Sequence, residues 1–390
     1  MPKLQDAQSA KTEKKKASSN AAWYGMKPKK QSTGEAVKAA AQSALSKMEE
    51  AGKPSSDEEA AAQEERRQVR YHSLSALYRK EMADHIASKR FIIILVLVIA
   101  MTVASVYGAI TGIRSALSDT SSQSSFDTTF MFLKLYTTSG NSIPSYMSLI
   151  ALIGPFIGLI LGFDAINAEK NNGTLNRLVS QPIYRDSIII GKFLAGATLI
   201  AVMVLSTGIA VGACGYLFSG IQPTGEQIAR VLVYLLITIV YICFWLAMSM
   251  LFSVFSRHAA TSALASIALW LFFAIFMSLL AGIIADGIYP VGTQYQQAVN
   301  AMKNANLNVG LNRISPYYLY SEAASTIMNP ATRAINAVSY AQLVGALSGY
   351  LSMGQSLLLV WPHLVGLVAL TFAAFEISYI GFMRQEIRSN

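Results

Sequence analysis

Two carboxylates lie inside long apolar stretches of the sequence, where an ionised side chain is costly. Asp164 is about one helical turn from the end of one stretch, and Glu376 is about two turns from the end of another. A charge at the centre of a bilayer costs roughly 2.5–3.5 kcal/mol, so such groups face a partner or a water-filled path. We interpret Asp164 as an interfacial carboxylate within reach of water or Lys170. For Glu376, a structural hydrogen bond and a place in a polar translocation path both stay open.

No pattern in the sequence indicates catalysis by this chain. The nucleotide-binding pattern G-x-x-x-x-G-K-[ST], the zinc pattern H-E-x-x-H and the nucleophile pattern G-x-S-x-G are all absent from it. The four histidines and two cysteines are too scattered to suggest a metal site. We therefore expect no catalytic, cofactor-binding or metal-binding residues, and no enzymatic activity of the chain's own.

The composition is that of a membrane protein. Of the 390 residues, 53% are hydrophobic and 14% are charged, whereas soluble domains average about 25% charged residues. Several apolar stretches exceed the roughly 18 residues that a membrane-spanning helix needs. We predict an all-α polytopic membrane protein with six transmembrane helices. They are expected at about 91–112, 145–166, 188–218, 231–255, 261–285 and 356–382.

Basic residues are concentrated on one side of these predicted helices. Eighteen of the 31 Lys and Arg residues precede residue 91, and six crossings put both ends of the chain on that same side. The positive-inside rule then predicts a cell-membrane protein with both termini cytoplasmic. Topology and attraction to anionic lipid headgroups explain the net charge of +9, so we expect membrane lipid, and not nucleic acid, as a partner.

The region before the first predicted transmembrane helix has two parts. Residues 1–70 are rich in Ala, Lys, Glu and Ser, which favours a disordered cytoplasmic tail. Residues 71–90 carry apolar side chains at helical spacing, including Leu74, Leu77 and Met82, with charges on the other faces. We predict an amphipathic elbow helix in the plane of the membrane interface.

The rest of the chain alternates between membrane and loops. Residues 91–285 contain transmembrane helices one to five and a cytoplasmic loop at 167–187. Residues 286–355 are expected to form a small extracytoplasmic helical segment, which packs on the membrane helices or on a second subunit. Residues 356–390 supply the sixth helix and a cytoplasmic end.

Small residues form a stripe on the second predicted helix. Gly154, Gly158 and Gly162 recur every four residues. Such a stripe lets two helix backbones approach closely in a membrane. Packing against another helix of the same chain and dimerisation along this face both stay open.

The loop at 167–187, between the second and third predicted helices, is polar and too short to fold as a domain. We interpret it as a rigid contact for another protein in the cytosol. Its residue pattern resembles that of the ABC-2 type permeases of bacterial and archaeal ABC transporters. The similarity is closest to a branch with a large outer loop between helices five and six, which includes permeases of the nitrous-oxide reductase maturation system. The matching residues are Glu169, Gly173-Thr174-Leu175, Leu178, Gln181-Pro182, Arg185, Gly191-Lys192 and Ile314-Ser315-Pro316, and the resemblance covers about 73–390.

This resemblance implies a half-transporter. Two permeases would pair, as a homodimer or a heterodimer, and each would dock a separate ATPase subunit that binds ATP. The loop at 167–187 would serve as the coupling helix: Gly173 permits a sharp start, and Pro182 ends the helix. Leu175 and Leu178, two apolar side chains three residues apart, would contact the ATPase. The expected coupling residues are Glu169, Gly173, Thr174, Leu175, Leu178, Pro182 and Arg185.

Three functions follow from this organisation. The leading hypothesis is the permease subunit of an ATP-driven ABC-2 exporter. The alternative is an ABC-like membrane complex that uses ATP hydrolysis for an extracytoplasmic mechanical or maturation task. A third possibility, an ATP-independent channel or carrier, is weakened because few ionisable residues lie within the predicted helices.

Overall fold

The computed structural model describes residues 38, 43, 56–118, 130–140, 142–171, 173, 184–220, 222–290, 297–330 and 350–385. The chain divides into two units, Met1–Gln68 and Val69–Asn390. In the first unit, residues 56–68 are helical, as their content of Ala, Glu and Gln favours. The second unit holds the membrane helices and is described below.

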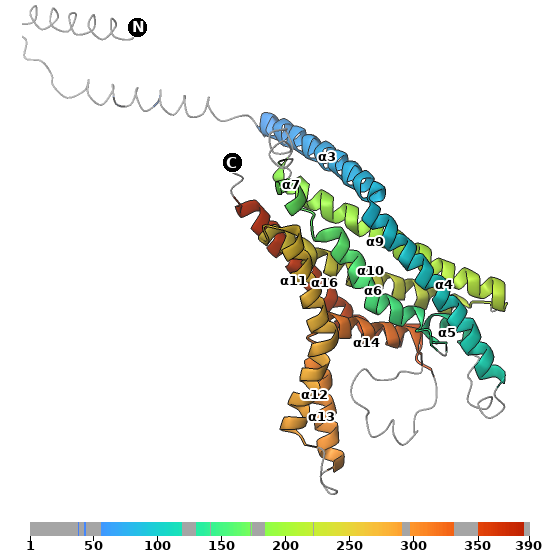
Figure 1. Ribbon diagram of the computed structural model, residues 1–390. Helices are drawn as coiled ribbons and strands as arrows, with labels where there is room; N and C mark the ends of the chain where they lie inside the picture. The colour runs from blue at the N-terminus through green and yellow to red at the C-terminus, as the bar shows by residue number, and fades with distance from the viewer. Residues whose placement is uncertain are drawn as a thin grey trace, which may run out of the picture. The chain divides into compact units, whose positions relative to one another are not determined.

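The described residues form helices without strands, and six helical segments are long and apolar enough to cross a membrane. The predicted all-α fold with six transmembrane helices is confirmed (Figure 1). The spans are α4 (Lys89–Ser118), α6 with α7 (Tyr146–Gly162, Asn167–Asn171), α9 (Arg185–Ser219), α10 (Gly225–Phe255), α11 with η2 and α12 (Ala259–Leu271, Phe272–Phe276, Met277–Ile288), and α16 (Met353–Arg384).

Helix α3 (Ser56–Ala87) leads into the first span, and it begins before residue 71, where the sequence predicted the amphipathic helix to start. Ser88 separates it from α4. The Ser88 hydroxyl accepts a hydrogen bond from the Phe91 backbone N–H at 3.2 Å and donates to the His85 carbonyl at 2.8 Å. One serine therefore begins α4 as its N-cap and closes the last turn of α3.

Helix α10 is the centre of the bundle. In its most apolar stretch 67% of the residues are buried, against 11% in the α11–α12 span. Its large side chains Tyr234, Tyr241 and Trp245 are fully buried. Helices α6, α9, α14 (Pro316–Met328) and α16 all contact it, so α10 sets the positions of the other spans.

The glycine stripe of α6 faces α10 of the same chain. A Cβ on Gly158 would lie 2.6 Å from the Ile242 carbonyl oxygen, and one on Gly162 would lie 2.9 Å from the Leu246 carbonyl oxygen. A Cβ on Gly154 would lie 3.0 Å from the Ile242 side chain. Of the two arrangements that the sequence left open, the structure has packing within one chain, and this stripe is covered by α10.

The segment between spans five and six packs on the membrane helices. Helix α13 (Gln297–Asn312) lies against α12 (Figure 1), and α14 then enters the bundle. Ser315 joins them: its hydroxyl accepts from the Tyr318 N–H and donates to the Phe273 carbonyl at 2.8 Å. Phe273 lies in the π-helical turn at the middle of its span, so α14 begins near half the depth of the bundle.

Aromatic contacts hold α14 at that depth. The Tyr320 ring stacks on Tyr241, with centroids 4.2 Å apart and planes at 6°. The Tyr320 hydroxyl lies 3.0 Å from the Thr238 hydroxyl. Of the two expectations for residues 286–355, packing on the membrane helices is the one seen for α14.

Arg230 connects α10 to α14 and α16 and is fully buried. Its five N–H donors all have acceptors: Nε and Nη2 bind Glu226, Nη1 binds the Ile327 carbonyl at 3.0 Å and the Ser356 hydroxyl at 3.1 Å, and Nη2 also binds the Leu351 carbonyl at 2.6 Å. The predicted start of the fourth helix at about residue 231 left Arg230 just outside the membrane spans, as a loop residue. Instead, the guanidinium satisfies two carbonyls that would otherwise be buried without a donor.

A Gly158→Ala substitution should lower thermal stability, because its Cβ would meet the α10 backbone and push the helices apart. We expect a loss of about 1–3 kcal/mol, the usual cost of overpacking. Scanning fluorimetry of the purified chain measures it. Gly287→Ala is the matched control, since nothing lies within 4 Å of a Cβ there; equal midpoints for the two variants would contradict the close α6–α10 contact.

Arg230→Met should destabilise the chain by roughly 3–5 kcal/mol, because it leaves Glu226 and two carbonyls without their donor. Arg257→Met, at an exposed position, should have little effect. Thermal unfolding of both variants compares them directly. If both lost stability equally, Arg230 would not be the link between α10 and α14.

Candidate functional site

Four charged side chains meet where α3, α7 and α9 come together. We call Lys80, Glu81, Glu169 and Lys192 the charge cluster. The Lys192 ammonium lies 2.9 Å from a Glu81 oxygen and 2.8 Å from a Glu169 oxygen. The Lys80 ammonium lies 2.9 Å from Glu81 and 3.3 Å from Glu169. Two cations and two carboxylates therefore form a charge-balanced set that joins three helices.

The packing of α3 on α9 brings these groups together. A Cβ on Gly191 would lie 3.1 Å from the Leu77 side chain, so the glycine makes room for that leucine. Leu77 is buried at 3% exposure. One helical turn after Leu77 comes Glu81, and directly after Gly191 comes Lys192. The glycine–lysine pair thus supplies both the space and the charge for α3.

Burial makes the cluster electrostatically strong. The side chains of Lys192, Glu81 and Glu169 are only 5%, 6% and 11% exposed. Burial by itself would raise the pKa of Glu81, but Lys192 and Lys80 hold that pKa below its ordinary value. Burial would lower the pKa of Lys80, but its bond with Glu81 and the nearby carboxylates raise it. Removing one member of a buried ion pair costs more than its formation gains, because a charge is left without a partner.

Glu169 belongs to the start of the predicted coupling loop. It lies on α7, the short helix at the end of span two. The Ser253 hydroxyl of α10 accepts hydrogen bonds from the N–H groups of Ile166 and Asn167, at 3.0 and 3.2 Å. Gly173 follows with a φ of 69°, in the left-handed region that favours glycine. The backbone of Gly173 thus has the conformation that a sharp turn uses, and its role at the start of a coupling helix stays a prediction.

Arg185 fixes the other end of the loop, at the first residue of α9. Its Nη2 donates to the Gln385 carbonyl at 2.9 Å, and its guanidinium lies 5.8 Å from the centre of the Phe382 ring. Gln385 in turn donates to the Val254 carbonyl at 2.7 Å. The loop is thus attached to α3 and α9 at its start, and to α10 and the end of α16 where it finishes.

The structure describes three of the seven predicted coupling residues. Glu169, Gly173 and Arg185 occupy the two ends of the loop. Thr174, Leu175, Leu178 and Pro182 lie outside the described residues, so the predicted coupling helix between those ends stays a prediction.

The two intramembrane carboxylates have different surroundings. Asp164 forms an ion pair with Arg90 at the start of α4, and the Arg90 guanidinium also lies 5.2 Å from the centre of the Phe163 ring. The partner is therefore Arg90, although Lys170 was the expected cation. Glu376 is exposed on α16 in the single chain, so its two interpretations, a structural hydrogen bond and a place in a translocation path, stay predictions.

Sequence reasoning missed the importance of Glu81 and Lys192. Lys192 was noted only as part of a motif, and Glu81 only as a charge on an amphipathic helix. A signal was available: a lysine two turns inside an apolar helix needs a buried anion. The same signal applies to His363, whose Nε2 lies 2.8 Å from Glu322, a carboxylate that also binds Arg313.

Comparison with known proteins supplies the family. The family model described as "ABC-2 family transporter protein" matches residues 75–387. A relative from Pseudomonas aeruginosa, named "Probable ABC transporter permease protein NosY", is 28% identical over 149 residues, which cover 37% of this chain and 52% of that protein. A protein of the same name from Stutzerimonas stutzeri is 35% identical over 88 residues, which cover 22% of this chain and 32% of that protein.

The chain spans about half the length, or less, of these curated relatives. The family model, in contrast, covers most of the chain and includes α4 to α16 together with the charge cluster. The resemblance seen in the loop motif, including the NosY-like branch, is confirmed by these matches. The chain belongs to the ABC-2 transporter family and is a multi-pass transmembrane component of that family.

Proposed function

We propose that this chain is the permease subunit of an ATP-driven exporter and receives its driving force through the loop at 167–187. One observation carries the proposal: Glu169, at the start of the loop, is held by Lys80 of α3 and Lys192 of α9 at the same time. A displacement of the loop would therefore act on two other helices at once. A loop without such contacts could move and leave the spans in place.

The direction of the chain in the membrane follows from its charges. The end of the bundle that carries the charge cluster also carries Arg90, Arg185 and Arg257. By the positive-inside rule, we assign that end and both chain termini to the cytoplasmic side of the cell membrane. The loop would there be accessible to a separate ATPase subunit, which would bind ATP, since this chain has no nucleotide-binding motif of its own.

The proposed cycle needs two permeases and two ATPases. Closure of the ATPases on ATP would push each loop, and the charge cluster would pass the displacement to α3 and α9. Helix α10, which contacts α6 and α9, would tilt with them. The two halves would then alternate between states open to opposite sides of the membrane.

The alternative function is a mechanical or maturation task on the far side of the membrane. It is favoured by α14, which begins near half the depth of the bundle and reaches its far end, where Arg230 binds the Ile327 carbonyl. Movement of α10 would shift α14 directly. Reconstitution in liposomes separates the two functions: an exporter carries a solute across the bilayer when ATP is hydrolysed, and a mechanical complex hydrolyses ATP without net transport.

The double substitution Leu175→Asp plus Leu178→Asp should abolish co-purification with the ATPase subunit, because two apolar anchors would become charged. Affinity purification from co-expressing cells measures the loss. Arg257→Met is the control, because Arg257 is exposed beside α7 but lies outside the loop. It should leave co-purification unchanged. Retention of the ATPase by the double variant would contradict docking through this loop.

Glu169→Gln should separate docking from coupling. The glutamine fills the same space but no longer balances Lys80 and Lys192, so the link from the loop to α3 and α9 weakens. We expect the ATPase subunit to stay bound while the ATPase rate of the complex falls toward that of the isolated subunit.

Asp84→Asn is the matched control for this test. Asp84 also pairs with Lys80, but its side chain is 62% exposed, and exposed pairs contribute little. The control should keep the coupled ATPase rate. An unchanged rate for Glu169→Gln would contradict a coupling role for the charge cluster.

A further inference from the structure

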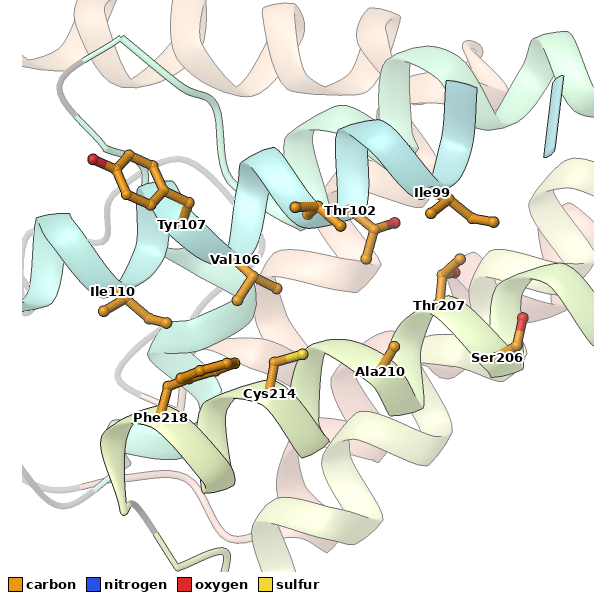
Figure 2. Close-up of a pocket in the computed structure, with 11 residues that line it drawn as sticks. Ile99, Thr102, Val106, Tyr107, Ile110, Ser206, Thr207, Ala210, Cys214 and Phe218 are labelled. Atoms are coloured by element: carbon orange, nitrogen blue, oxygen red, sulfur yellow. The ribbon is translucent and has the colours of Figure 1, made fainter. Parts of the chain in front are cut away.

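An apolar pocket lies between the first and third spans, away from the charge cluster. It has a volume of about 480 Å³, within the roughly 300–1,000 Å³ range of small-ligand sites. Figure 2 shows side chains of α4 on one side of it and side chains of α9 on the other. The lining residues are Ile99, Thr102, Val103, Val106, Tyr107, Ile110, Ser206, Thr207, Ala210, Cys214 and Phe218.

The serine and threonine hydroxyl groups in this lining are already hydrogen-bonded within the protein. Thr102 donates to the Val98 carbonyl at 2.7 Å, and Thr207 donates to the Met203 carbonyl at 2.8 Å. Ser206 also donates to the Met203 carbonyl, at 3.0 Å. Because these donors are used by their own helices, the wall offers mainly carbon atoms, and the pocket suits a hydrocarbon better than a polar solute.

The pocket opens toward the hydrocarbon region of the bilayer. Val103 and Tyr107 on α4 are each 65% exposed, and Phe218 on α9 is 68% exposed. All three lie within the segments long enough to span a membrane. Packed interiors do not keep voids of this size, and the molecules next to this opening in a bilayer are lipid chains.

A cation lies on the same helix face, one turn beyond the pocket. Val103, Tyr107, Ile110 and Arg114 follow each other at spacings of four, three and four residues, which places them in one stripe along α4. Arg114 is exposed close to the end of α4. At that depth a guanidinium meets lipid headgroups and can bind a phosphate with two parallel hydrogen bonds.

We propose that α4 and α9 form a binding site for one phospholipid, in the leaflet opposite the charge cluster. One hydrocarbon chain fills the pocket, and Arg114 binds the phosphate of the headgroup. Transfer of a lipid chain from bilayer to pocket brings no hydrophobic gain, because both surroundings are apolar. Specificity comes from dispersion contacts in a shaped pocket and from the charge of Arg114.

Photo-crosslinking in vesicles tests this site. The full-length chain is reconstituted in phosphatidylglycerol vesicles that contain a small fraction of the same lipid with a diazirine on one acyl chain, and labelled peptides are mapped by mass spectrometry. We expect labelling of residues 99–110 and 206–218 well above that of the equally exposed face of α16, which includes Leu358 and Phe372. Labelling in proportion to exposure on both faces would overturn the proposal.

Filling the pocket gives a second test. Ala210 is exposed and lines the pocket, so Ala210→Trp should reduce labelling there to the level on α16, and the smaller Ala210→Leu should reduce it in part. Ala369→Trp, on the exposed face of α16, is the matched control and should leave labelling at the pocket unchanged. If both filling variants eluted as folded proteins and kept full labelling, the pocket would not be the binding site of the lipid acyl chain.

The headgroup contact has its own readout. Arg114→Glu should remove the preference for photoreactive phosphatidylglycerol over photoreactive diacylglycerol, which lacks the phosphate, whereas Arg257→Glu at the other end of the bundle should preserve it. A preference unaffected by Arg114→Glu would overturn the role of that arginine. A disulfide between Cys214 residues of two copies, formed in the membrane under mild oxidant, would show instead that a second permease covers the pocket.

Discussion

The two ion pairs of Lys192, with Glu81 and with Glu169, are the interaction on which the loop end of the bundle depends. All three side chains are almost fully buried, and a lysine two turns inside a membrane helix is tolerated only with such partners. Each carboxylate comes from a different element, so the same contact that neutralises the lysine also joins α3, the loop and span three. The cost of leaving Lys192 unpaired ensures that the three elements stay together.

Arg230 has a comparable role toward the other end of the bundle. It is buried in α10, and three of its five hydrogen bonds reach α14, Leu351 just before α16, and α16 itself. Tyr320 and Ser315 hold α14 at the middle of the spans. Because α10 carries both Arg230 and Ser253, which caps the start of the loop, one helix contacts the structures at both ends. A mechanical path from loop to far side therefore needs no flexible element between them.

The six spans could be predicted because apolar stretches of about 20 residues have no other stable use. The glycine stripe could also be predicted as a helix-packing face from its four-residue spacing. The spacing alone does not say whether the facing helix belongs to the same chain, and the close approach of Gly158 to α10 shows that it does. The depth of α14 could not be predicted, since it depends on the stacking of Tyr320 on Tyr241 between residues far apart in sequence. Likewise, the motif around Glu169 indicated a coupling loop, but the pairing of Glu169 with Lys192 required the packing of α7 against α9.

The most direct test of our central claim is whether the loop and α3 move as one body. Spin labels at Tyr71 on α3 and Lys170 on α7, both exposed, would report their separation by pulsed EPR in the complex with the ATPase, in a background without Cys214. A third label at Leu358, near the start of α16 and 78% exposed, gives an external reference at the end of the bundle away from the loop. Our account predicts that ATP changes both distances to the reference and leaves the distance between residues 71 and 170 unchanged. A change in the 71–170 distance on ATP binding would contradict it.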